Sequence, residues 1–168
     1  MTYPHEMIIK DDYNSPVRAY FHGLCSPDVG GHACSGFHVP AHPAIISHEP
    51  IEGYRWVLTG PSATAMLASY NAILDCLTSL WEKGIHVPLV LCCDQGSVID
   101  ECNHHQVVVD DCTPLGVVKY RLAKAQRFFG KVTFELVTPA ENVRAIHLAN
   151  RALEWVTGKA PKPPRQRI

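Results

Sequence analysis

Histidine and cysteine are the side chains of this chain most able to do chemistry, because both ligate metals and act in catalysis near neutral pH. The sequence has ten histidines and seven cysteines among 168 residues. Seven is an odd number, and none of the cysteines belongs to a Cys-x-x-Cys pair. This pattern predicts reduced thiols and a cytoplasmic, intracellular location rather than a disulfide framework.

Two short segments combine residues that could form a site. Cys92 and Cys93 lie in VPLVLCCD, residues 87–94, an apolar run typical of a strand buried on both faces, so we interpret them as core residues. Asp94 closes this run and is either a residual metal ligand or, as we favour, the N-cap of the helical turn that follows. NHHQVVVDD, residues 103–111, contains two adjacent histidines and two adjacent acids, and we interpret it as a connector between two helical segments.

The overall charge of the chain limits the partners that can be expected. The formal net charge is −1, with 46% hydrophobic and 18% charged residues. A protein that grips a phosphate backbone is usually basic, so a protein partner is favoured over nucleic acid. No apolar run approaches the roughly 18 residues that span a bilayer, so no membrane contact is expected.

The elements that must position these residues follow from hydrophobic periodicity. Three strands, a helix, a strand, two helices, a strand and a helix follow one another, which predicts one mixed α/β sheet flanked by helices. A capping box, Thr138-Pro139-Ala140-Glu141, marks the start of the last helix. The predicted strands are 17–24, 34–40, 53–60, 87–94 and 131–138, and the other predicted helices are 62–83, 95–103 and 113–130.

The ends of the chain differ in composition from the middle. Residues 1–16 are polar and are expected to be a flexible leader, residues 17–158 form the predicted domain, and residues 159–168 form a proline-rich basic tail. Such a tail cannot build a core, so it is either a solubilising terminus or an exposed binding segment. Its candidate binding residues are Lys159, Lys162, Arg165 and Arg167.

Four segments in this order resemble the ribonuclease H-like superfamily, ribonuclease HI type. FHGLCSPDVGGHACSGFHV resembles its first hairpin, and LASYNAILDCLTSLWEKGI resembles its first helix. LVLCCDQGSVIDECN is similar to its fourth strand and following turn, and FELVTPAENVRAIHLANRAL to its closing strand and helix. The resemblance covers about residues 17–155. It implies a mixed five-stranded sheet, three antiparallel strands and then two parallel ones, flanked by helices.

The chemistry of that family depends on four carboxylates that converge on two divalent metal ions. The corresponding positions here are His22, Ser69, Asp94 and Ile146. One carboxylate of four remains, and Mg²⁺ needs clustered oxygen ligands. The resemblance therefore implies a pseudoenzyme with no cofactor and no catalytic residues, only vestigial site positions.

The resemblance leaves a rebuilt metal site as an alternative. It implies neighbouring strands for His22 and Asp94, and with His147 they could hold Zn²⁺ or Mn²⁺. His147 is one residue past the expected ligand position, a rotation of about 100° on a helix.

We therefore expect a catalytically inactive protein that acts as a protein-binding or adaptor module. Its contact surface could be an exposed sheet edge, the histidine-rich loop 38–48 or the tail. One alternative is a nucleic-acid-binding protein that retains a groove for an RNA–DNA hybrid. Another is a metal-dependent nuclease with a rebuilt site around His22 and Asp94.

Overall fold

The computed structural model describes residues 15–28, 30–45, 49–104 and 112–159. Its centre is a five-stranded sheet in the order β3-β2-β1-β4-β5. β1, β2 and β3 pair antiparallel, whereas β4 is parallel to β1 and β5 is parallel to β4. The predicted mixed sheet is thus confirmed. The strands are β1 Val17–Ser26, β2 His32–Val39, β3 Ile51–Thr59, β4 Leu89–Cys93 and β5 Val132–Leu136.

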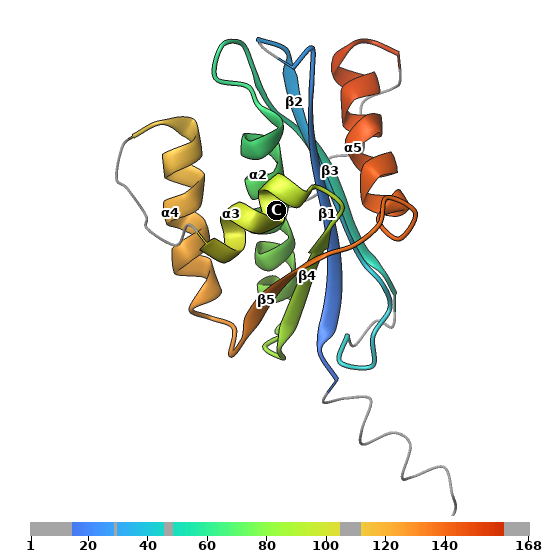
Figure 1. Ribbon diagram of the computed structural model, residues 1–168. Helices are drawn as coiled ribbons and strands as arrows, with labels where there is room; N and C mark the ends of the chain where they lie inside the picture. The colour runs from blue at the N-terminus through green and yellow to red at the C-terminus, as the bar shows by residue number, and fades with distance from the viewer. Residues whose placement is uncertain (1–14, 29, 46–48, 105–111, 160–168) are drawn as a thin grey trace, which may run out of the picture.

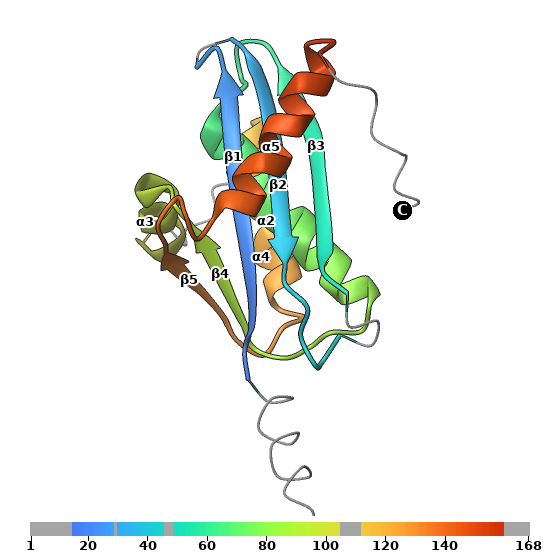
Figure 2. The same ribbon diagram turned by 90° about the vertical axis from the view of Figure 1, so that its right-hand side faces the viewer.

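Helices cover both faces of the sheet (Figures 1 and 2). α5 lies on one face, across β1, β2 and β3, and α2 lies on the other, with α4 on the far side of α2. α3 lies beside β4 and β5. The helices are α2 Ala65–Glu82, α3 Gly96–His104, α4 Pro114–Gln126 and α5 Val143–Val156.

The main core lies between the sheet and the α2 layer. β1 directs Val17, Ala19 and Phe21 into this layer, where they meet the apolar stripe of α2, including Ile73 and Leu77. This follows from the two periodicities, because alternate strand residues share one face and residues three or four apart share a helix face. The core is continuous from β2 through α2 to α4.

Two glycines let the helices approach the sheet closely. A Cβ at Gly23 of β1 would lie 2.2 Å from the backbone nitrogen of Ser69 in α2. A Cβ at Gly36 of β2 would lie 2.5 Å from the backbone nitrogen of Ala149 in α5. Real Cβ atoms do not approach that near, so glycine at these two positions fixes how both helices sit on the sheet.

Two helices begin several residues later than predicted, and α4 ends at Gln126 rather than at residue 130. α2 begins at Ala65, not at 62, because Thr64 caps it and accepts a hydrogen bond from the Leu67 N–H (3.0 Å). The capping box at Thr138 and Glu141 does form. It closes a turn, however, and α5 begins only at Val143.

Several predictions concern residues outside the described ranges. They include most of the 1–16 leader, part of loop 38–48, most of NHHQVVVDD, and the tail residues Lys162, Arg165 and Arg167. Among the described residues, no helix combines the length and apolar character that crossing a membrane requires.

Candidate functional site

The candidate site lies where β1 and β4 run side by side. β1 carries His22, and Asp94 follows the last residue of the parallel strand β4. The His22 Nδ1 lies 2.9 Å from Oδ1 of Asp94, and both side chains are only about one-eighth exposed (13% and 11%). The expected proximity of these two residues is therefore present. When Asp94 is ionised it can only accept, so Nδ1 carries the proton of this bond.

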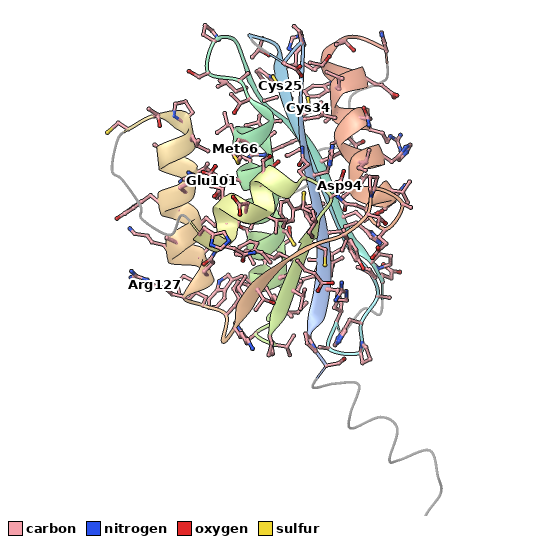
Figure 3. The ribbon with its side chains drawn as sticks, viewed as in Figure 1. Cys25, Cys34, Met66, Asp94, Glu101 and Arg127 are labelled. Atoms are coloured by element: carbon pink, nitrogen blue, oxygen red, sulfur yellow. The ribbon has the colours of Figure 1, made fainter. Side chains whose placement is uncertain are left out.

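Asn142 joins this pair from the start of α5. Its side chain is fully buried, and Nδ2 donates to Oδ1 of Asp94 (2.6 Å) and to the backbone oxygen of Phe21 (2.9 Å). Figure 3 shows Asp94 between the end of β4 and the beginning of α5. The Asn142 Oδ1 is buried without a hydrogen-bond partner in the described structure. Asn142 thus ties three elements, β1, β4 and α5, to one point.

A second amide, that of Gln95, fills the space between β1 and α2. Its Nε2 donates to the backbone oxygen of Gly23 (2.7 Å), and its Oε1 accepts from the Gly23 N–H (3.3 Å). The single hydroxyl proton of Ser69 is shared between the same Oε1 (3.0 Å) and the backbone oxygen of Ala65 (2.8 Å). Ser69 is therefore committed to a structural network.

Asp94 is part of a three-way contact rather than a simple helix cap. We had favoured a capping role because aspartate is a preferred N-cap. In the structure its Oδ1 accepts from His22 and Asn142, while α3 begins two residues later, at Gly96. The carboxylate thus receives donors from neighbouring elements of the sheet and from α5.

The structure does not bring the remaining predicted residues to this cluster as metal ligands. Ile146 is half-buried on α5, and the next residue, His147, is exposed. Within the ranges that the structure describes, no three His, Cys, Asp or Glu side chains form a group that could hold a metal ion. His22, Asp94 and His147 all lie in those ranges, so they do not form such a group.

The thiols near the cluster are poor nucleophiles. Burial raises the pKa of the Cys93 thiol to about 12 and that of Cys92 to about 11. A thiol with such a pKa is almost entirely protonated at neutral pH, whereas the thiolate is the reactive form. All seven cysteines are unpaired, and only Cys112 is exposed.

An apolar cavity of about 360 Å³ lies elsewhere, between β3, α2 and α4. Leu67 and Leu74 of α2 and Val117 of α4 are among its lining residues. None of the residues of the His22–Asp94–Asn142 cluster lines it. It is therefore separate from the candidate site.

Two residues of the site, Asn142 and Gln95, are not among those predicted from the sequence. Neutral amides carry no charge signature and fit no metal-ligand spacing. Only their positions in the sequence could have indicated a role. Asn142 begins the NVRAIHLAN segment, and Gln95 directly follows Asp94, the only acid of the predicted strand 87–94. Of the tail residues, Lys159 is described and is exposed.

Comparison with solved structures finds the same fold in ribonucleases H1. The structure of RNase H1 from the halophilic archaeon Halobacterium salinarum NRC-1 has a TM-score of 0.66 and 24% identity, covering 83% of this chain and 98% of that one. LC11-RNase H1, isolated from compost by a metagenomic approach, was solved with an RNA/DNA hybrid. It has a TM-score of 0.67 and 16% identity, covering 84% of this chain and 99% of that one. At these identities the likeness establishes the fold.

A further similar structure is the prototype foamy virus protease-reverse transcriptase, with a TM-score of 0.62 and 16% identity. The match covers 84% of this chain and 21% of that larger protein. A search of curated proteins finds no match. The family model described as reverse transcriptase-like matches residues 48–152, more than half of the chain. The chain, which has the ribonuclease H-like fold, belongs to the reverse transcriptase-like family.

Proposed function

We propose that this chain is a ribonuclease H-fold binding protein that does not cleave nucleic acid. The observation that carries the proposal is the position of Asp94. Its Oδ1 accepts from a histidine and an asparagine, where the resemblance to ribonuclease HI implies a cluster of carboxylates around cations. The site thus holds one carboxylate among nitrogen and hydroxyl groups.

The donor set does not fit the two divalent ions on which that family depends. Mg²⁺ requires several oxygen ligands, and an imidazole suits Zn²⁺ or Cu²⁺ better. The Asp94 Oδ1 already receives two hydrogen bonds, and the Ser69 hydroxyl proton is shared between Gln95 and Ala65. A metal ion bound at Oδ1 would compete with His22 and Asn142 for that oxygen. We therefore assign no hydrolytic step to the site.

A direct test is hydrolysis of a labelled RNA/DNA hybrid by the full chain in Mg²⁺, Mn²⁺ or Zn²⁺. We expect no cleavage above the level of the Asp94→Asn variant, while an active ribonuclease H1 cleaves the same substrate. Metal-dependent cleavage that Asp94→Asn abolishes would instead establish a rebuilt nuclease site around His22 and Asp94.

The binding role is supported by the fold, which this chain retains in full with a close-packed core. Near-neutral net charge favours a protein partner, which could contact the tail that begins at Lys159. A pull-down from the native cell with the full chain and with a form lacking residues 159–168, each repeated after nuclease treatment, tests this. A partner that is lost with the tail and kept after nuclease treatment supports the adaptor role. Loss of all partners after nuclease treatment contradicts it.

A further inference from the structure

Positive charge is concentrated in one stretch of this near-neutral chain. Residues 112–134 contain five lysines and arginines and no aspartate or glutamate. Four of these cations, Arg121, Lys124, Arg127 and Lys131, are exposed. The net charge of −1 is therefore an average over an uneven distribution, and it does not describe the surface that α4 presents.

The cations lie on α4 and on the segment that follows it, together with exposed aromatic side chains. Tyr120 is 47% exposed and Phe128, just beyond the end of the helix, is 58% exposed. Tyr120 and Lys124 are four residues apart and share one face of α4, while Val118 and Leu122 are buried on the other. Arg127, Phe128 and Lys131 are exposed on the segment that follows the helix. We call this surface the α4 face; it consists of Tyr120, Arg121, Lys124, Arg127, Phe128, Lys131 and the neighbouring Trp81.

The aromatic rings of the α4 face are arranged as an open platform. The rings of Trp81 and Phe128 are 4.5 Å apart, and His86 meets the edge of Trp81 at 4.8 Å. Trp81 remains 44% exposed. At the other end, the ammonium of Lys124 lies 4.4 Å from the centre of the Tyr120 ring. Large apolar rings on a surface gain stability when another flat group covers them.

The fold directs the α4 face away from the rest of the molecule. α4 lies on the outer side of α2, and Figure 3 shows Arg127 at the C-terminal end of α4. The fifth cation, Lys119, turns inward and pairs with Glu101 of α3. The nearby acid of α3 is thus used within the fold, and the outward face keeps its positive charge.

From this arrangement we propose that the α4 face binds single-stranded nucleic acid. The cations bind the phosphates, and the rings of Trp81, Phe128 and Tyr120 stack with unpaired bases. Arg121 and Lys124 are three residues apart, a rise of about 5 Å along the helix, and Arg127 and Lys131 continue the positive charge beyond its end. A paired duplex would hide its bases from the rings, and an acidic protein would use the charge but not the ring faces. The inference goes beyond the proposed function, because it adds a nucleic-acid ligand on α4 to the protein partner proposed for the tail.

Fluorescence anisotropy of the full chain with a labelled single-stranded oligonucleotide tests the proposal. We expect binding at low salt whose affinity falls as salt rises, with a log–log slope of about −2 to −3 for three or four phosphate contacts. Arg127→Ala should reduce the steepness of the slope by about 0.7. Phe128→Ala should weaken binding roughly 5- to 100-fold through lost stacking.

Matched variants on the opposite side of the molecule serve as controls. Arg151→Ala removes an exposed arginine of α5, and Trp56→Ala removes a partly exposed ring of β3. Both should bind like the wild type, and all variants should unfold at similar temperatures. Equal losses in Arg127→Ala and Arg151→Ala would overturn the assignment to α4. So would equal competition by polyglutamate of the same charge, which would show that the face recognises acidic protein.

Binding on α4 and the absence of cleavage can be tested separately. Running the same samples on a gel shows whether the nucleic acid is cut. Cutting would contradict the non-cleaving role and leave binding on α4 in place. Absence of binding at low salt would contradict the α4 assignment and leave the non-cleaving role in place.

Discussion

The side-chain amide of Asn142 donates to Oδ1 of Asp94 over 2.6 Å and so ties the start of α5 to the end of β4. Because Asn142 is fully buried, Asn142→Ala removes two hydrogen bonds and leaves the Phe21 carbonyl unpaired. We expect a loss of about 2–4 kcal/mol in the free energy of unfolding, measured by urea denaturation.

A second substitution at Asn142 distinguishes its hydrogen bonds from its volume. Asn142→Leu retains the volume but not the donors, and we expect it to be about as destabilising as alanine. Wild-type stability of the leucine variant would show that Asn142 only fills space.

Our proposal that His22 occupies a carboxylate position of the ribonuclease H site predicts an engineered dependence on divalent cations. His22→Asp places a second carboxylate beside Asp94, where like charges repel in the absence of a cation. We expect a melting temperature below that of the wild type in chelator and a rise when Mg²⁺ or Mn²⁺ is added, because a ligand that binds only the folded state stabilises it.

The neutral variant His22→Asn is the control for that experiment. It has a similar size but adds no charge, so its melting temperature should not respond to the cation. If Mn²⁺ stabilised the wild type as strongly as His22→Asp, the native residues would already hold a metal, contrary to our inference.

The sequence predicted the sheet and the proximity of His22 and Asp94 because both rest on strong signals. Alternating and helical periodicity located the elements, and the resemblance to a known fold placed β1 beside β4. The roles of Asn142 and Gln95 were not predicted, because they depend on which neutral groups from different helices and strands come into contact in the fold. The positive charge of α4 was missed for a different reason. Its cations, such as Lys119 and Arg121, entered the prediction only through the net charge of the whole chain, which is near zero.

The close contact at Gly23 predicts that a larger residue at this position destabilises the fold. Gly23→Ala forces a methyl group to 2.2 Å from the Ser69 backbone, which must move α2 and disturb the Gln95 network. We expect a loss of about 1–3 kcal/mol or more in the free energy of unfolding. The measurement is thermal or urea unfolding of the purified variant.

Gly96 provides the matched substitution in the same region. It is the first residue of α3, and a Cβ there meets nothing within 4 Å. Gly96→Ala should be neutral or stabilising by up to about 1 kcal/mol, because alanine favours helix and restricts the unfolded chain. Equal destabilisation by the two alanines would contradict the idea that close packing on α2 selects glycine at position 23.

The contact between Glu52 and Arg144 should make the free energy of unfolding depend on pH. Arg144 of α5 donates to both oxygens of Glu52 on β3 (2.5 and 2.8 Å), and His38 lies 2.9 Å from Oε2. The Arg144 hydrogen bonds lower the pKa of Glu52 below its usual value, against a smaller opposing effect of burial. A lowered folded-state pKa means that the unfolded chain binds the proton more readily. The resulting stability is therefore present above the unfolded value of about 4.3 and is lost as pH falls through the folded pKa.

The variant Glu52→Gln should therefore lose stability at neutral pH but not in acid. Because the Arg144 side chain is almost half exposed, we expect a loss of only about 1 kcal/mol at pH 7, or a melting temperature lower by about 2–4 °C. Glu135→Gln, at a more exposed pair with Arg18, should lose less. Urea titrations of the wild type and both variants from about pH 7 to pH 3 measure this. A gap between wild type and Glu52→Gln that stays constant or widens in acid would show that the contact with Arg144 does not depend on the charge of Glu52.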